Sequence, residues 1–209
     1  MFKNRAEAGL LLAPPLKQHA NTNSIVLGIP RGGVVTAAAV AEKLNLPLAA
    51  VVVKKIPAPH QSELAIGAIG PAGTVYYNKD VIRNLGLSKK ELAKQAGIAR
   101  FQQQEYQEKF QSSPVRLKGK TVLLVDDGIA TGATVLCAIA YLRRRNVDKI
   151  VLAVPVIHPD VMEVLLGQVD VYVVLEESYA FASVGQFYRE FEQVEEEEVV
   201  RLLGAYRAR

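Results

Sequence analysis

Short apolar runs of strand length recur along the chain. Most are rich in β-branched residues, and they lie at Ser24–Leu27, Leu48–Val53, Thr121–Val125, Lys149–Val154 and Val169–Leu175. At least one segment with apolar residues at helical spacing separates each consecutive pair of runs. Strands that alternate with helices are typical of βαβ units. The pattern therefore predicts an α/β fold with a parallel sheet of about five strands flanked by helices.

Three further signals mark helix boundaries. Ser88-x-x-Glu91 is a capping box, which predicts that a longer helix begins after Ser88. Pro159 and Gly167 bracket a short helix ahead of the last strand. The acidic run Glu195–Glu198 suits the first turn of a final helix, where the helix dipole stabilises negative charge.

The two ends of the chain fall outside this alternating pattern. Residues 1–16 and those from about 178 onward contain enough apolar side chains to pack, so they predict a small accessory subdomain beside a core of residues 20–177. The length of 209 residues favours one domain, and a hydrophobic content of 50% is sufficient for a substantial core.

Charge and cysteine content narrow the class of protein. The net charge of +4 suits polyanionic metabolites, but the basic residues are scattered and form no stripe that predicts a nucleic-acid partner. Cys137 is the only cysteine, so no intramolecular disulfide can form and a reducing compartment is favoured. No run approaches the roughly 18 apolar residues of a membrane span, and the apolar N-terminal stretch is too short for a signal peptide. We therefore expect a cytoplasmic protein with no membrane partner.

The segment Val122–Thr134 (V-L-L-V-D-D-G-I-A-T-G-A-T) carries the strongest chemical signal. Asp126 and Asp127 end a strand of the kind that is buried on both faces, at the edge where open α/β sheets bind ligands. The loop that follows has the glycines, hydroxyls and helix N-terminus of an anion cradle. Two acceptors beside a phosphate cradle suit a ribose 5-phosphate. A strand-turn-helix junction with a chance Asp pair, or a receiver-like domain, is the alternative, but a receiver has no need of the T-G-A-T cradle.

The first strand ends in a second glycine-rich loop, Gly28-Ile29-Pro30-Arg31-Gly32-Gly33. The planar guanidinium of Arg31 suits bidentate contact with phosphate, and the two glycines leave backbone N–H groups accessible. The loop is not a Rossmann G-x-G-x-x-G motif, and a glycine pair after a strand can be only a tight turn.

A third group of candidates follows the second strand. Lys54 and Lys55 can each reach a diphosphate as a point charge, or be ordinary solvated residues. Three prolines and three glycines follow in a long connection, which we expect to be an irregular, mobile lid over about residues 55–78. His60 and Glu63 are the polar candidates within this lid.

Four aromatic residues are concentrated between Phe181 and Phe191. Phe181, Phe187 and Tyr188 are candidates for stacking on a ligand, although packing within the accessory subdomain explains them equally well.

These motifs together resemble the signature of type I phosphoribosyltransferases, which bind 5-phosphoribosyl 1-diphosphate (PRPP). The resemblance covers nearly the whole chain. The combination of P-R-G-G, S-E-L-A-I-G-A-I, D-D-G-I-A-T-G-A-T and V-G-Q-F-Y is similar to a bacterial group known only as predicted phosphoribosyltransferases. It implies a single phosphoribosyltransferase domain over residues 1–209, with a Rossmann-like parallel sheet, a hood from residues 1–16 and 178–209, and a lid that closes over PRPP.

The resemblance also implies roles for individual residues. Asp126 and Asp127 would hold the ribose 2′- and 3′-hydroxyls, and Pro30–Gly33 would form the pyrophosphate loop, with a cis peptide bond between Pro30 and Arg31. Arg31, together with Lys54 or Lys55, would neutralise the leaving diphosphate. The hood would bind the acceptor through Phe181, Phe187 or Tyr188. The residues that would grip the 5′-phosphate are Gly128, Ile129, Ala130, Thr131, Gly132, Ala133 and Thr134.

We therefore expect an enzyme that transfers the phosphoribosyl group of PRPP to a nitrogen acceptor, such as a nucleobase or related heterocycle, and releases pyrophosphate. Mg²⁺ would be bound mainly through PRPP oxygens and waters, without a metal site made of protein ligands. The alternative is a regulator of the same fold that senses PRPP or nucleotides and binds RNA or DNA, for which the basic charge is the only support. An inactive scaffold would be expected to lose the carboxylates or the cradle, and this chain has both. The sequence leaves a homo-oligomer open.

Overall fold

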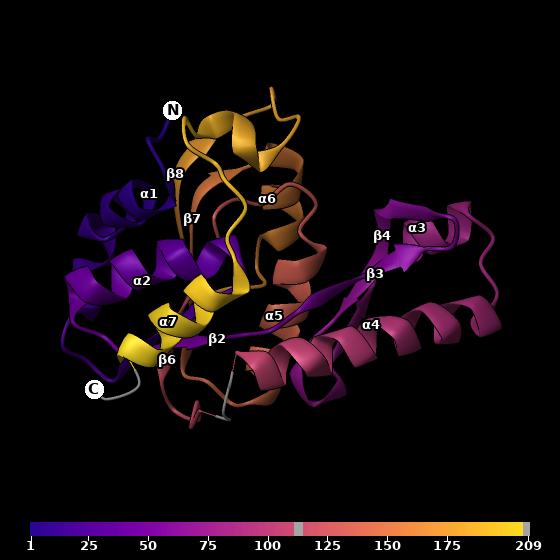
Figure 1. Ribbon diagram of the computed structural model, residues 1–209, viewed down its shortest axis with the longest axis horizontal. Helices are drawn as coiled ribbons and strands as arrows, with labels where there is room; N and C mark the ends of the chain where they lie inside the picture. The colour runs from indigo at the N-terminus through magenta and orange to yellow at the C-terminus, as the bar shows by residue number, and fades with distance from the viewer. Residues whose placement is uncertain (111–114, 207–209) are drawn as a thin grey trace.

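A five-stranded parallel sheet lies at the centre of the computed structural model, which describes residues 1–110 and 115–206 apart from the side chains of Ser62 and Glu63 (Figure 1). The strand order is β2-β1-β6-β7-β8, which confirms the predicted α/β fold with a parallel sheet of five strands. The strands are β1 (Ser24–Gly28), β2 (Leu48–Ala50), β6 (Thr121–Val125), β7 (Lys149–Ile157) and β8 (Val171–Glu177).

Two strands differ in length from the predicted apolar runs. β2 ends at Ala50 rather than at Val53, because its partner β1 ends at Gly28 and leaves the following residues without a ladder. β7 continues through Pro155 to Ile157, beyond the predicted end at Val154. Its ladder with β6 ends at Ala153, and its pairing with β8 skips Pro155, which has no N–H to donate, and resumes at Val156.

Alternating side chains of the sheet divide the core into two layers. In β6, Leu123 and Val125 face one layer, whereas Val122 and Leu124 face the other. The first layer is covered by α1 (Arg5–Leu12), α2 (Gly32–Leu44) and α7 (Glu196–Tyr206). The second layer is covered by α5 (Ala133–Arg144) and α6 (Pro159–Leu165). Because every central strand is buried on both faces, the carboxyl edge of the sheet is where polar loops can gather.

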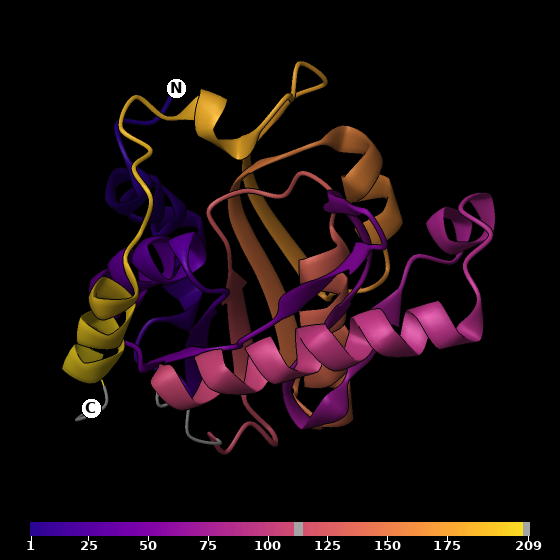
Figure 2. The same cartoon turned by 45° about the vertical axis from the view of Figure 1, so that its right-hand side comes forward.

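The segment predicted to be an irregular lid is instead a three-stranded antiparallel sheet of order β3-β4-β5. We call residues 54–77, which contain it, the flap. Ile56, Ile66 and Ile69 of the flap are buried against Ala96 and Ala99, and this apolar face explains the regular structure. Figure 2 shows the flap and the long helix α4 extending together from the central sheet. The elements are β3 (Lys54–Ala58), β4 (Gln61–Ile69), β5 (Val75–Tyr77), α3 (Lys79–Asn84) and α4 (Lys89–Lys109). Mobility of the flap stays a prediction.

The predicted helix signals agree with the observed boundaries. Ser88 caps α4, its hydroxyl accepts from the Glu91 amide at 3.3 Å, and the Glu91 carboxylate accepts from the Ser88 amide at 2.9 Å. α6 lies between Pro159 and Gly167, and α7 begins with three glutamates. The short 3₁₀ helices are Pro14–His19, Pro71–Gly73 and Val184–Phe187. Among the described helices, none is both long and apolar enough to cross a membrane.

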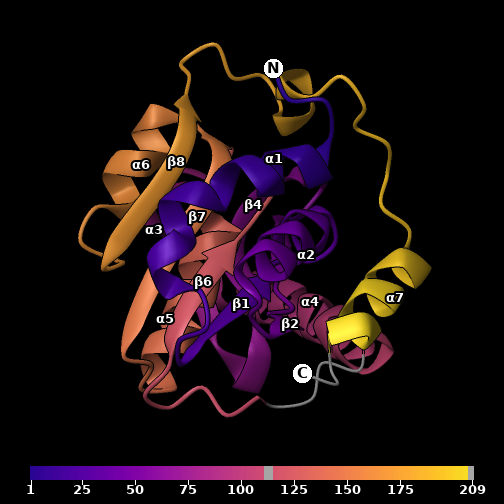
Figure 3. The ribbon, with the colours of Figure 1, turned by 90° about the vertical axis from the view of Figure 1, so that its left-hand side faces the viewer.

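The two terminal segments meet above the carboxyl edge of the sheet, as Figure 3 shows. The amide of Phe2 donates to the carbonyl of Phe187 at 2.7 Å, and a small cluster joins Phe2, Ala8, Val156, Phe187 and Tyr188. We refer to this cluster and the adjoining residues 181–192 as the hood. The helices α1 and α7, which the sequence assigned to the same subdomain, pack instead on α2 in the main core. Residues 207–209 lie outside the described residues.

The close approach of α1 to α2 predicts that replacing two helical glycines by alanine has opposite effects on stability. A Cβ on Gly9 would overlap the carbonyl oxygen of Thr36 and lie 2.8 Å from the Cβ of Ala39, whereas a Cβ on Gly97 in α4 meets nothing within 4 Å. Gly9→Ala should therefore lower the free energy of unfolding by about 1–3 kcal/mol. Gly97→Ala should raise it by about 0.5–1 kcal/mol. Urea unfolding of both variants checks this, and equal effects would contradict the proposed α1–α2 packing.

Burial of Cys137 predicts an inert thiol. The side chain is fully buried, its sulfur lies 3.5 Å from the carbonyl oxygen of Thr74, and burial raises its pKa to about 12. At pH 8 only about one thiol in ten thousand would be ionised. A thiol-exchange reagent should therefore titrate no cysteine in the native protein and one per chain in guanidinium. Fast reaction of the native protein would refute the burial of Cys137.

Candidate functional site

The connectivity of the sheet places two of the predicted motifs side by side. From β1 the chain passes through α2 to β2 on one side, while β6 pairs with β1 on the other side. The carboxyl edge between β1 and β6 is thus a topological switch point, where open α/β sheets bind ligands. Gly28 is opposite Val125 in the register, so the loops after these two residues leave the sheet as neighbours.

These neighbouring loops are in direct contact. A Cβ on Gly32 would overlap the carboxylate of Asp127, and a Cβ on Gly33 would lie 2.7 Å from Oδ1 of Asp126. The sequence predicts that these glycines keep backbone N–H groups accessible, but this is only one reason why glycine is needed at the two positions. The second reason is steric, since only hydrogen side chains allow the acidic pair to pack against the loop.

The two carboxylates have different surroundings. Oδ1 of Asp126 accepts a hydrogen bond from the Asp127 amide at 2.9 Å. Burial raises the pKa of Asp126 well above its ordinary value, and the adjacent charge of Asp127 adds to the rise; the charge of Lys55 acts in the opposite direction. Asp127 is held by an ion pair, with its Oδ2 at 2.7 Å from Nε of Arg5.

Arg5 is a site residue that sequence reasoning missed. It lies 122 positions before Asp127 and belongs to no motif, so no local pattern could have identified it. Tyr188, predicted as an acceptor contact, is buried in the hood, and its hydroxyl donates to the carbonyl of Asp127 at 2.6 Å. Burial and the charge of Asp127 raise the pKa of Tyr188, which keeps its phenol protonated as a donor.

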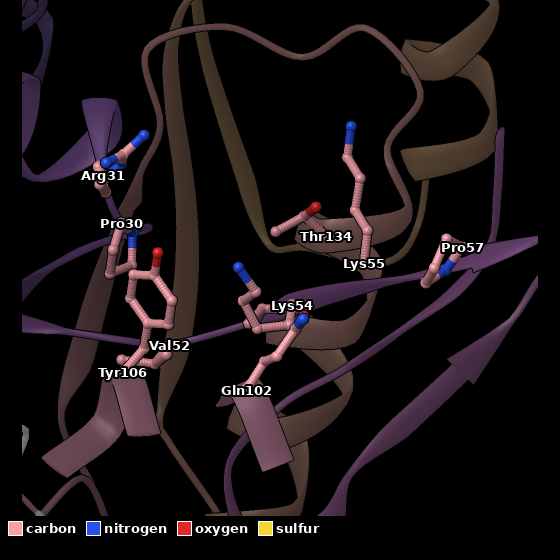
Figure 4. A pocket seen from close by; sticks show the side chains of 10 residues that line it. Pro30, Arg31, Val52, Lys54, Lys55, Pro57, Gln102, Tyr106 and Thr134 are labelled. Atoms are coloured by element: carbon pink, nitrogen blue, oxygen red, sulfur yellow. The ribbon is translucent and has the colours of Figure 1, made fainter. Parts of the chain in front are cut away.

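A cavity of about 400 Å³ lies between the P-R-G-G loop (Pro30–Gly33), the flap and α4 (Figure 4). The peptide bond between Pro30 and Arg31 is cis, as the resemblance implied. The ammonium of Lys54 lies 4.3 Å from the centroid of the Tyr106 ring. Burial, and then the charge of Arg31, lower the pKa of Lys54. The lining residues are Pro30, Arg31, Val52, Val53, Lys54, Lys55, Pro57, Gln102, Tyr106 and Thr134.

Two of these lining residues come from α4 and were not predicted. Neither Gln102 nor Tyr106 belongs to a predicted motif. Their part in the cavity depends on how α4 packs across the root of the flap, which helical periodicity alone does not reveal.

The predicted phosphate cradle leads into α5. Gly132 has φ +74° and precedes the first residue of the helix, so a side chain there would be strained. Ala130 and Thr131 are exposed, Ala133 is buried and Thr134 lines the cavity. Gly128 and Ile129 are tied instead to the hood side of the sheet, because a Cβ on Gly128 would meet Val184 and the Ile129 amide donates to Val156.

The remaining candidates are less close to this cavity. His60 is exposed at the turn between β3 and β4 and is not among the described residues that line the cavity. The side chain of Glu63 lies outside the described residues. Phe181 is partly exposed on the hood, whereas Phe187 is buried beneath it with the two ring centroids 5.0 Å apart. Acceptor contact by these rings stays a prediction.

Comparisons with known proteins agree with the geometry. A curated Mycobacterium tuberculosis protein, "Putative phosphoribosyl transferase Rv0571c" in strain H37Rv and MT0597 in strain CDC 1551, is 41% identical over 208 residues. That match covers 97% of this chain and 46% of the relative, so the chain spans about half the length of the curated relatives it matches. The crystal structure of TT1426 from Thermus thermophilus is 34% identical, covers 98% of both chains and superposes with a TM-score of 0.82.

A family model matches most of the chain. Residues 11–178 fit the family model described as the phosphoribosyl transferase domain. This range contains the P-R-G-G loop, both flap lysines and the acidic motif at the switch point. The chain therefore belongs to the phosphoribosyl transferase domain family.

Proposed function

We propose that the protein transfers the 5-phosphoribosyl group from PRPP to a nitrogen of a nucleobase or related heterocycle. The observation that carries this proposal is the contact of Asp126 and Asp127 with Gly32 and Gly33 at the switch point. It brings a pair of hydroxyl acceptors against a loop suited to diphosphate. These are the two chemically different ends that PRPP presents around its anomeric carbon.

Each part of PRPP has a matching group in this arrangement. The carboxylates of Asp126 and Asp127 accept from the ribose 2′- and 3′-hydroxyls. The loop Ala130–Thr134 and the N-terminus of α5 receive the 5′-phosphate. Arg31 binds the diphosphate, and Lys54 and Lys55 add positive charge from the start of the flap.

The reaction exchanges one bond at the anomeric carbon. The C1′–O bond to pyrophosphate breaks and its electron pair leaves with the pyrophosphate oxygen. The acceptor nitrogen supplies the pair that forms the new C1′–N bond and gives up its proton to solvent. Arg31 and the lysines stabilise the negative charge that develops on the leaving group. The carboxylates hold the ribose ring in place as it acquires positive charge.

The acidic pair is compatible with a magnesium ion that is coordinated mainly by oxygens of the substrate. The described residues contain no group of three or more His, Cys, Asp or Glu side chains placed to hold a metal. Asp126 and Asp127 offer oxygen ligands beside the proposed diphosphate site, which is the usual arrangement for Mg²⁺. When bound, Mg²⁺ supplies charge neutralisation for the departing pyrophosphate.

The flap and the hood provide the remaining conditions for transfer. Pro57 of the flap forms one side of the cavity, so closure of the flap would exclude water from the ribose cation. Phe181 is the most exposed of the three hood aromatics predicted to stack on the acceptor.

We also propose a cytoplasmic location, which the single buried Cys137 suits.

A screen of acceptors tests the proposed reaction. Purines, pyrimidines and other heterocycles are incubated with PRPP and Mg²⁺, and pyrophosphate release is measured against acceptor consumed. One acceptor class should give one pyrophosphate per acceptor modified, and the double substitution Asp126→Asn/Asp127→Asn should abolish it. PRPP binding without turnover across the whole screen would favour a regulator, and absence of PRPP binding would reject both functions.

The raised pKa of Asp126 predicts opposite effects of one substitution on stability and on binding. The folded chain holds the Asp126 proton more tightly than the unfolded chain, so the free energy of unfolding falls as pH rises from 3.8 through the raised pKa. At neutral pH Asp126→Asn removes this penalty. It should raise Tm by about 2–4 °C per kcal/mol relieved. It should also weaken ribose 5-phosphate binding about tenfold or more.

Asp148→Asn is the matched control, because Asp148 is exposed and precedes β7 at the opposite edge of the sheet. It removes the same charge and should change neither quantity. Calorimetry of ribose 5-phosphate binding and thermal unfolding at pH 7 give both results. A destabilised Asp126→Asn variant with full affinity would contradict the assignment.

A further inference from the structure

Arg5 is held on three sides at the junction of the hood and the acidic pair. Its Nε donates to Oδ2 of Asp127 at 2.7 Å, and its Nη1 donates to the carbonyl of Glu192 at 2.8 Å. The guanidinium carbon lies 3.7 Å from the centroid of the Phe191 ring, close enough for a cation–π contact. The side chains of Arg5 and Asp127 are only 12% and 15% exposed. This ion pair is therefore screened far less by water than a surface pair.

The hood also fixes the backbone of Asp127. The Tyr188 hydroxyl donates to the Asp127 carbonyl, and the Tyr188 ring stacks on Phe191 with centroids 4.9 Å apart. Arg5 packs on the same Phe191 ring. The N-terminal helix and the C-terminal segment thus converge on a single residue of the acidic pair.

Asp126 has no comparable cation among its hydrogen-bond partners in the part of the chain that the structure describes. Its Oδ1 accepts from the Asp127 amide. Two adjacent carboxylates repel each other, and a cation fixed to one of them reduces this repulsion while it selects one side-chain orientation. Arg5 supplies that cation for Asp127.

The ion pair is compatible with a ligand on the same carboxylate. An ionised carboxylate offers about four acceptor positions, so a ribose hydroxyl and an N–H group can bind one Asp together. Displacement of Arg5 by the ligand would break its contacts with Glu192 and Phe191 as well. The guanidinium is anchored, and we therefore expect it to remain in place when the ribose binds.

We propose that Arg5 is the positioning residue of the ribose subsite, which holds Asp127 in its diol-binding orientation and links packing of the hood to binding of the sugar. The proposal rests on the proposed function. Arg5 acts through Asp127 and contacts no reacting atom. Arg5 also lies beside Gly32, where a Cβ would be 2.7 Å from its Nε, but its hydrogen bonds go to Asp127 and Glu192, so we expect the ligand half that carries the diol to depend on it more than the diphosphate half.

The test compares ribose 5-phosphate with inorganic pyrophosphate, each with Mg²⁺, on the whole chain. Arg5→Ala should weaken ribose 5-phosphate binding about tenfold or more, because Asp127 loses the charged hydrogen bond that holds it in its diol-binding orientation. Pyrophosphate binding should change by less than about twofold. Arg5→Lys should recover part of the loss, since an ammonium reaches Asp127 as a point charge but cannot form the guanidinium fork. Lys3→Ala, an exposed cation two residues away, should bind both ligands as the wild type does.

A double-mutant cycle separates positioning from a general structural role. If Arg5 acts through Asp127, Arg5→Ala should cause no further loss of ribose 5-phosphate affinity in the Asp127→Asn background. Additive losses, or an equal loss of both ligands in Arg5→Ala, would overturn the proposal. Should Arg5→Ala fail to fold in urea titrations, the same comparison on Arg5→Lys decides it. A wild type that binds neither ligand would instead reject the proposed function itself.

Discussion

Two neighbouring negative charges at the end of a buried strand are the constraint on which the rest of the site depends. Asp126 and Asp127 can occupy this place only because the facing loop has no side chain at Gly32 and Gly33. Arg5 compensates one charge by direct contact, and the charge of Lys55 opposes the rise that burial and Asp127 cause in the pKa of Asp126. Each cation comes from a different part of the chain, so α1, the flap and the central sheet are joined electrostatically at one point.

Much of the fold follows from local patterns. The β-branched runs predict the central strands because such residues suit a strand that is buried on both faces. Ser88 and Glu91 fix the start of α4 through two local hydrogen bonds. The flap was misinterpreted because its prolines and glycines are typical of loops. Its structure depends on Ile56 and Ile66, which are buried only when α4 packs beside them.

The same distinction holds for the site. The acidic pair and the P-R-G-G loop are each a continuous stretch of sequence, so each could be recognised as a candidate from its residues alone. Arg5, Gln102 and Tyr106 reach the site by packing of separate elements, and no local periodicity contains that information. Tyr188 shows the converse case. Its aromatic character was recognised, but its hydroxyl is directed to the backbone of Asp127.

Lys54 and Lys55 form the first residues of β3, so the flap begins at its own cations. A segment that pivots about its root moves most at its tip, near the turn between β3 and β4, and least where it joins the core. Opening of the flap in the proposed reaction would therefore move the residues beyond Pro57, while the two lysines keep their places at the cavity beside a bound diphosphate. Departure of pyrophosphate would then be limited by the attraction of residues that stay in place, rather than by the movement that admits solvent.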